Sequence, residues 1–274
     1  MTALGHRQFR LIWLGFTASA VGYQTMFFAL GWLLVQLALR EGRPELAPLY
    51  LGIAGVSRGV PGLVAALLSG VYADRMDRRR LMVLARAVAA FVALGLAFLV
   101  LTDQVNLLWV VVLNALGAIA DSSDLPVRMS AVARILEPRD LMSAQALVNT
   151  THSVAGIVAP LLAGILIIAI GIGGLMLITA AASLVAAALL LGLDPMPPSQ
   201  TTHAGVIRSL RDGLVFVMSE PVLRWVVILS ATASIFARPM VGLLPAVAAN
   251  TLQVGASELS WLLAASAVGG IAGG

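Results

Sequence analysis

The sequence contains neither lysine nor cysteine, so all 17 basic residues among its 274 are arginines. Without lysine the chain has no phosphate-binding lysine of a nucleotide-binding loop, no Schiff base and no lysine general base. Without cysteine it has no disulfide, thiolate metal site or cysteine nucleophile. These absences exclude ATP hydrolysis by a P-loop within this chain and several classes of covalent enzyme.

Charge of either sign is also scarce, because only 11% of the residues are charged whereas 60% are hydrophobic. An ordinary soluble domain carries about 25% charged residues. A deficit of this size over the whole length excludes a water-soluble globule, a disordered chain and a nucleic-acid-binding domain.

The hydrophobic residues form runs long enough to cross a bilayer, whose ~30 Å core needs about 20 apolar residues in a helix. Spans are predicted at 11–39, 49–73, 81–102, 104–120, 222–248 and from Leu259 onward. The run 141–193 contains no Asp, Glu or Arg. As one helix it would be ~80 Å long, so Gly171, Gly173 and Gly174 are expected to divide it into spans five and six.

The predicted fold class is therefore all-α, a polytopic helical membrane protein. Residues 1–193 are expected to form an N-terminal bundle of six spans. Residues 194–221 are expected to be a cytoplasmic linker with an amphipathic helix. Residues 222–274 then hold span seven and the start of span eight.

The arginines are distributed unevenly between the two sides of these spans. Thirteen lie on the side of the N-terminus, only Arg40 and Arg43 lie on the other side, and Arg58 and Arg238 lie within spans. Cytoplasmic connections carry the excess of positive residues, so the N-terminus is predicted to be cytoplasmic. This bias also explains the net charge of +4 without a nucleic-acid partner.

The connection between spans two and three carries a regular pattern of glycine and charge. Gly70 lies four residues before the pair Asp74-Arg75, which begins at Asp74, and Arg78 and Arg79 follow at fixed spacing. A simple positive anchor would explain the charges but not this spacing. The segment resembles motif A of the major facilitator superfamily (MFS), G-x-x-x-D-R-x-x-R-R.

Two further segments resemble the drug, macrolide and siderophore efflux branch of that family. Asp124-Leu-Pro-Val-Arg128 is similar to its connection between spans four and five, and Leu210-Arg-Asp-Gly-Leu214 with Pro221, Leu223 and Arg224 looks like its entry into span seven.

A third segment resembles the exporter motif of span five. Gly156, Pro160 and Gly164 match that motif, although alanines replace two of the motif glycines. Ordinary packing of small residues around a proline kink is an equal alternative for this segment.

The resemblance implies a secondary active transporter rather than an enzyme, working by alternating access between two six-helix halves. Its branch implies export of amphipathic small molecules by a monomer in the bacterial cytoplasmic membrane. The expected partners are the substrate and the lipid bilayer, with no cofactor and no metal, and H⁺ is the coupling ion the family suggests. The alternatives are a transporter-like sensor or scaffold that moves nothing and an importer of another solute. Family members have about twelve spans, so the chain is expected to be C-terminally incomplete.

The resemblance also implies roles for the residues at the cytoplasmic ends. Motif A would be a cytoplasmic latch, with Asp74 accepting hydrogen bonds and its arginines holding the closed geometry. Asp124 and Arg128 are the expected latch partners, and Asp74 is predicted to lie near Arg128.

Charges within spans are functional hypotheses by default, because they are costly in a bilayer. Arg58 and Arg238 are both expected ~14 Å below the outer surface, where they could approach one another. One interpretation is a contact for an anionic substrate; the other is an arginine bonded to backbone carbonyls near Pro61 or Pro239.

The remaining candidates are weaker. Tyr23 and Gln24 of span one would line a substrate cavity, or simply pack. His152 would be a proton relay, or a packing residue. No carboxylate is predicted in the middle of a span, because Asp121 and Asp124 fall at the end of span four. The sequence alone therefore does not display the machinery for proton coupling.

Overall fold

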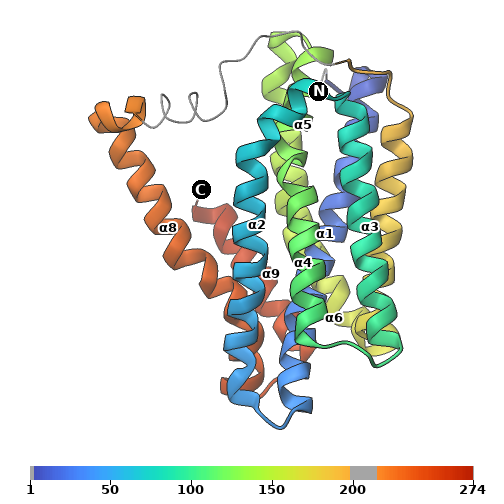
Figure 1. Ribbon diagram of the computed structural model, residues 1–274, viewed down its shortest axis with the longest axis vertical. Helices are drawn as coiled ribbons and strands as arrows, with labels where there is room; N and C mark the ends of the chain where they lie inside the picture. Colours follow the sequence, from blue (N-terminus) through green and yellow to red (C-terminus); the bar gives the residue numbers. More distant parts are fainter. Residues whose placement is uncertain (1–2, 198–214, 274) are drawn as a thin grey trace.

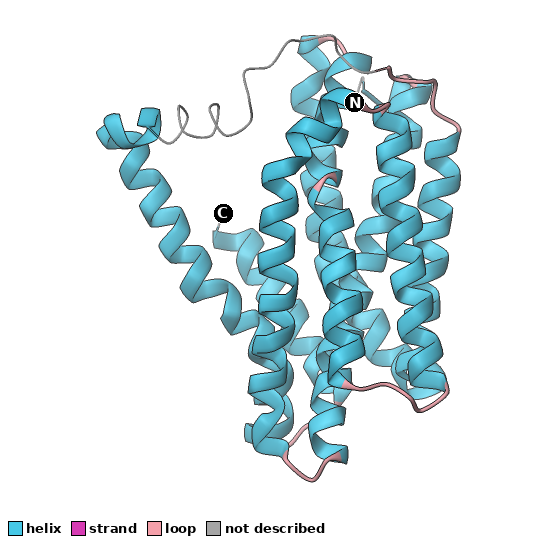
Figure 2. Cartoon of the chain, in the orientation of Figure 1, coloured by secondary structure: helices cyan, strands magenta, loops and turns pink. Residues whose placement is uncertain are grey.

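The computed structural model describes residues 3–197 and 215–273, with side chains throughout except at 3, 68–75, 233–235, 237–238 and 271–273. It consists of helices that run back and forth along one long axis (Figures 1 and 2). The helices are α1 (Arg7–Arg40), α2 (Ala47–Arg75), α3 (Arg78–Leu101), α4 (Leu107–Ser122), α5 (Asp124–Ile135), α6 (Pro138–Leu191), α8 (Pro221–Ala246) and α9 (Ala256–Gly273). A π-helical turn, Val247–Thr251, follows α8.

The long helix α6 is two helices joined at Gly171, as the glycine pattern predicts. Gly171 has φ 67° and ψ −176°, a conformation outside the helical region that glycine adopts readily. In the first arm, residues 138–170, Thr151 accepts a hydrogen bond from Trp13 of α1. Further along both helices, Gly156 of this arm lies near Gln24. In the second arm, residues 172–191, the order of contacts with α1 is reversed, because Ala186 lies near Gly15 and Ala182 lies near Gly22. The two arms therefore run in opposite directions.

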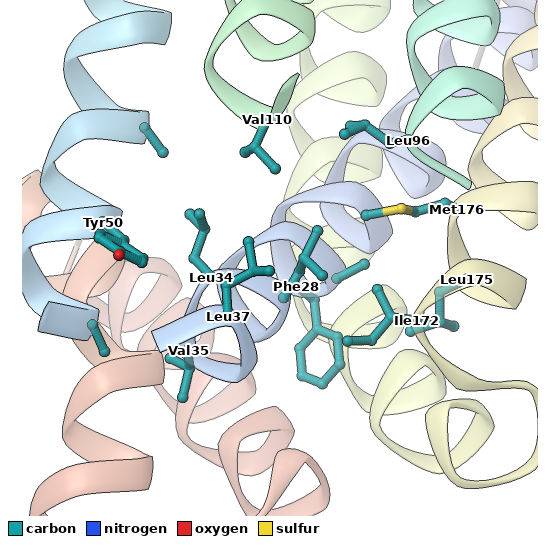
Figure 3. Packing of buried hydrophobic residues seen from close by; sticks show 14 of the residues in the cluster. Phe28, Leu34, Val35, Leu37, Tyr50, Leu96, Val110, Ile172, Leu175 and Met176 are labelled. Atoms are coloured by element: carbon teal, nitrogen blue, oxygen red, sulfur yellow. The ribbon is translucent and has the colours of Figure 1, made fainter. Parts of the chain in front are cut away.

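Small residues bring α1 close to the second arm of α6. A Cβ atom at Gly15 would lie 3.5 Å from the carbonyl oxygen of Ala186, and one at Gly22 would lie 3.3 Å from Ala182. Close backbone approach through glycine is a common way for membrane helices to pack. The outer part of the bundle is filled by a large apolar cluster that includes Phe28, Leu34, Val110, Leu175 and Met176 (Figure 3).

The region around span four differs from the prediction. Asn106 caps α4 by accepting a hydrogen bond from the amide of Trp109 at 3.0 Å, so the helix begins at Leu107 rather than at residue 104. At its other end α4 continues to Ser122, and α5 follows after a single residue. The helical, apolar segment thus extends over Leu107–Ile135, and Asp121 lies inside it rather than beyond its end.

The segment after α6 crosses the same end of the bundle at which α1 begins. The amide of Met196 donates to Asp77 at 2.9 Å, and the amide of Arg78 donates to the carbonyl oxygen of Met196 at 3.2 Å. Arg134 donates to the carbonyl oxygen of Pro197 at 2.8 Å. The N-terminus, the start of α3, α5 and the end of α6 therefore share one end of the bundle, which we call the inner end. We call the opposite end, where α1 ends and α4 begins, the outer end. This arrangement fits the alternating order of the predicted spans.

The two helices after the linker lie against one side of the bundle. α8 contacts α2, and α9 contacts α6. In Figure 1, α8 is on the opposite side of the molecule from α3 and the second arm of α6. Most of the predicted amphipathic linker helix falls in residues 198–214, outside the described residues, so the predicted domain division stays a prediction.

Candidate functional site

Five charged side chains from four helices alternate in sign through the interior of the bundle. Arg58 of α2 contacts Asp121 of α4 at 2.7 Å, and Arg86 of α3 contacts the other oxygen of Asp121 at 2.9 Å. Arg86 also lies 3.6 Å from Asp124, which lies 3.3 Å from Arg128 of α5. We call this series, Arg58–Asp121–Arg86–Asp124–Arg128, the charge ladder.

The two ends of the charge ladder differ in exposure. The exposed fraction of the side chain is 34% for Arg58 and 26% for Asp121, against 8% for Arg86, 19% for Asp124 and 9% for Arg128. Ionised groups inside a helical membrane bundle are tolerated when they pair. Three guanidinium groups face two carboxylates, so the ladder retains one formal positive charge in excess. Arg58 is the most exposed member of the ladder, so its guanidinium is the positive group that a ligand can contact.

An aromatic ring of α1 covers the guanidinium at each end of the ladder. The ring of Phe16 lies 4.0 Å from the guanidinium carbon of Arg128, and the ring of Tyr23 lies 5.0 Å from that of Arg58. These rings are seven residues apart, two turns along one face of α1. Cation–π contact stabilises an arginine over an aromatic face. The charge ladder therefore runs alongside α1.

Asn114 of α4 orients the exposed end of the ladder. Its buried side-chain amide donates to the carbonyl oxygen of Ala54 at 2.8 Å and to the hydroxyl of Ser57 at 3.1 Å. The remaining amide oxygen lies 3.5 Å from Arg58. Because both N–H donors of the Asn114 side chain bind acceptors on α2, its amide oxygen is held toward the guanidinium of Arg58.

A cavity of about 80 Å³ opens beside Arg58 between α1, α2, α3, α4 and the second arm of α6. Tyr23, Met26 and Phe27 of α1 form an apolar wall, and Arg58 and Asp121 form part of the polar wall opposite. The volume holds several water molecules. An apolar wall that faces a few fixed polar groups is typical of sites for small amphipathic molecules.

The structure corrects the predicted surroundings of Arg58. Its guanidinium contacts the side chains of Asp121 and Asn114, so the interpretation of an arginine bonded to backbone carbonyls near Pro61 is wrong. The carboxylate of Asp121 lies between Arg58 and Arg86. The side chain of Arg238 is outside the described residues, so its approach to Arg58 stays a prediction.

Sequence reasoning did not select Arg86 and Asp121 as site residues. A signal for them was present, because Asn114 and Asp121 are seven residues apart and share a face of α4 with Gly117. Arg86 lies two turns inside an apolar helix. What the sequence did not show is which helix faces which.

The predicted latch residues are only partly described. Arg128 and Asp124 pair with one another. Arg78 is buried, and its Nε and Nη1 atoms have no hydrogen-bond partner among the described residues, whereas Arg79 donates to the carbonyl oxygen of Leu191. The side chains of Asp74 and Arg75, and the surroundings of Gly70, lie outside the described residues, so the latch and the contact between Asp74 and Arg128 stay predictions.

The glycines of the span-five motif lie where helices approach closely. A Cβ atom at Gly164 would come within 2.4 Å of the Cβ of Ser260 in α9, and one at Gly156 would lie 3.2 Å from the amide nitrogen of Gln24. Pro160 lies between them within α6. This geometry agrees with close helix packing and leaves a role in export open. Gln24 is at the α1–α6 contact, whereas Tyr23 lines the cavity.

His152 lies away from the charge ladder. Its side chain is exposed, and it makes no hydrogen bond or ion pair with any residue that the structure describes. Its role as a relay stays a prediction. In the described ranges, no group of three His, Cys, Asp or Glu residues is placed to hold a metal ion.

Membrane-spanning helices that enclose paired charges beside an amphipathic cavity are an arrangement found in membrane transporters. The family model of the Major Facilitator Superfamily matches residues 12–274, and the chain belongs to that superfamily. The fold class predicted from the sequence, an all-α polytopic MFS fold, is confirmed. The family is one of transporters and not of enzymes.

The chain is similar to curated exporters over most of its length. It is 26% identical over 223 residues to enterobactin exporter EntS of Shigella boydii serotype 18, covering 81% of this chain and 53% of that protein. It is 25% identical to enterobactin exporter EntS of Escherichia coli O1:K1, with the same coverage. The chain thus spans about half the length of the curated relatives it matches.

Two solved structures share the fold. The POT family transporter PepTSo superposes with a TM-score of 0.62 at 18% identity, covering 96% of this chain and 52% of that one. A POT family transporter in complex with thioalcohol conjugated peptide superposes with a TM-score of 0.58 at 12% identity, covering 85% of this chain and 47% of that one. At these identities the likeness shows the fold alone.

Proposed function

We propose that the full-length protein exports amphipathic small molecules that carry acidic groups, of the siderophore class, by alternating access. The observation that carries this proposal is the exposed end of the charge ladder. There a guanidinium with part of its charge uncompensated lies beside an apolar wall of α1. The names of the curated relatives, enterobactin exporters, support the same class of substrate.

Arg58 is the residue that would contact the acidic group. A guanidinium binds carboxylates and other planar acids through two donors, and it stays charged at any physiological pH. Tyr23 and Met26 would pack against the apolar part of the substrate. A substrate acid would compete with Asp121 for Arg58, and the coupling ion that we propose is H⁺, which the family suggests.

The setting of the proposal follows from the charges and the family. With thirteen arginines on one side, the N-terminus would lie in the cytoplasm of a bacterium and the protein in its cytoplasmic membrane. A complete pair of six-helix halves would enclose the cavity within one polypeptide, so a monomer suffices.

The test is flux in inside-out membrane vesicles that contain the full-length protein. With an imposed pH gradient, a siderophore that carries carboxylate groups is expected to accumulate in the vesicles, and a protonophore is expected to abolish the accumulation. Arg58→Gln is expected to lower siderophore uptake about tenfold, since a hydrogen-bonded charge contributes about 1.5–3 kcal/mol. Arg43→Gln, an exposed arginine of the outer end, is the matched control.

Each other outcome points to an alternative. No flux of any substrate would favour the sensor or scaffold. Uptake only into right-side-out vesicles would favour an importer. If Arg58→Gln lowers the uptake of the siderophore and of an uncharged amphipathic dye equally, Arg58 supports the fold and does not bind the acidic group of the substrate.

A further inference from the structure

A groove of about 490 Å³ lies at the inner end of the seam between α3 and the second arm of α6. Two arginines, Arg79 and Arg80, stand at its rim. Its walls are apolar and include Val83, Leu84, Ala87 and Leu191. The charge ladder is not part of this groove.

The groove faces away from the part of the protein where the second half begins. α8 and α9 contact α2 and α6, and Figure 1 places α8 on the other side of the bundle from α3. Along α3 the exposed large residues Leu84, Phe91, Phe98 and Leu101 follow one stripe. On the second arm of α6, Leu184 and Leu191 are exposed as well. Such a continuous apolar face on a membrane helix bundle is in contact with lipid.

The charges at the rim are available to a ligand. Arg80 is exposed, and its guanidinium makes no hydrogen bond or ion pair with a residue that the structure describes. Arg79 gives one hydrogen bond to the carbonyl oxygen of Leu191, which leaves its other donors. Asp77 also borders the groove, but its carboxylate accepts hydrogen bonds from the backbone amides of Arg80 and Met196. The rim therefore has a net positive charge.

We infer that this groove binds an anionic phospholipid of the inner leaflet, with its phosphate between Arg79 and Arg80 and an acyl chain along Leu84 and Ala87. Basic pockets between membrane helices on the cytoplasmic side recognise anionic headgroups in this way. A free anion would use the arginines but not the apolar walls, and the stripe from Leu84 to Phe91 continues the path of a chain into the bilayer. This lipid site is independent of the transported substrate.

Native mass spectrometry of the full-length protein titrated with phosphatidylglycerol or phosphatidylcholine tests the site. Wild type is expected to bind phosphatidylglycerol more tightly than phosphatidylcholine. Arg80→Gln is expected to weaken phosphatidylglycerol binding about fivefold, the effect of one arginine at an anionic membrane surface. Arg7→Gln, an exposed arginine at the same end, is the charge-matched control and is expected to change nothing.

A second variant separates the groove from charge alone. Ala87→Trp keeps both arginines, but the larger side chain fills the apolar part of the groove. This variant is expected to bind phosphatidylglycerol no more tightly than phosphatidylcholine. If Ala87→Trp binds like wild type, or if Arg7→Gln weakens binding as much as Arg80→Gln, the attraction is a general surface effect and the inference fails. Complete displacement of the lipid by inorganic phosphate would also overturn it, because the site would then bind a free anion.

Discussion

The two ends of the charge ladder use the same groups in different surroundings. Arg58 and Arg128 each face one aspartate and one aromatic ring of α1. Arg128 is 9% exposed, however, whereas Arg58 is 34% exposed and lines the cavity. Burial distinguishes them, and so does Asn114, which of these two arginines contacts only Arg58. We expect the buried inner end to contribute mainly to stability and the more exposed Arg58 to contribute mainly to binding.

The largest effect is expected at the aspartate that the two middle arginines share. Asp121→Asn leaves Arg58 and Arg86 facing each other without a carboxylate between them. Removing one partner of a buried pair costs about 3–5 kcal/mol, and the partial exposure of Asp121 reduces this to roughly 2–4 kcal/mol. Siderophore flux should fall at least about tenfold. Thermal unfolding of the purified protein and vesicle flux measure the two effects.

Asp103→Asn is the control for this change, because Asp103 pairs with Arg40 at the outer end with both side chains more than half exposed. An exposed pair contributes about 0–1 kcal/mol. If Asp121→Asn proves as mild as Asp103→Asn, the charge ladder has no special role.

A smaller effect tests the comparison of the two ends directly. Arg128→Gln is expected to lower the free energy of unfolding by about 2–3 kcal/mol, because it leaves Asp124 poorly compensated in a buried site. Arg58→Gln is expected to lower it by less than about 1 kcal/mol, since solvent reaches that end. Chemical denaturation in detergent measures both. Equal losses would mean that exposure does not separate the two roles.

The smallest effect concerns the two rings of α1. Phe16→Leu is expected to destabilise the protein by about 1–2 kcal/mol, because it removes a buried cation–π contact with Arg128. Tyr23→Leu should cost less than about 1 kcal/mol of stability and instead raise the KM for siderophore export a few-fold. A reversed order, with Tyr23→Leu more damaging to stability, would contradict the assignment of the buried end as the structural one.

Much of the fold could be predicted because each helix carries its own signal. The apolar run before Arg40 predicts α1 to within a few residues, and the uncharged run 141–193 with its glycines predicts a break that the structure has at Gly171. The predicted end of span four, Ala120, lies two residues before the end of α4 at Ser122, and what the prediction lacks is that Asp121 in this last turn points into the bundle. A carboxylate can remain inside a helix bundle when arginines from other helices neutralise it.

The sequence by itself determined that this chain lies in a membrane, where its spans lie to within a few residues, on which side its arginines gather and to which family it belongs. These properties depend on composition, run length and local motifs, which are read along one helix at a time. Only the tertiary structure decided that Arg58 and Arg86 share Asp121, from which they are 63 and 35 residues away in sequence. Pairing of this kind depends on the rotation and depth of three packed helices, and no local pattern encodes them.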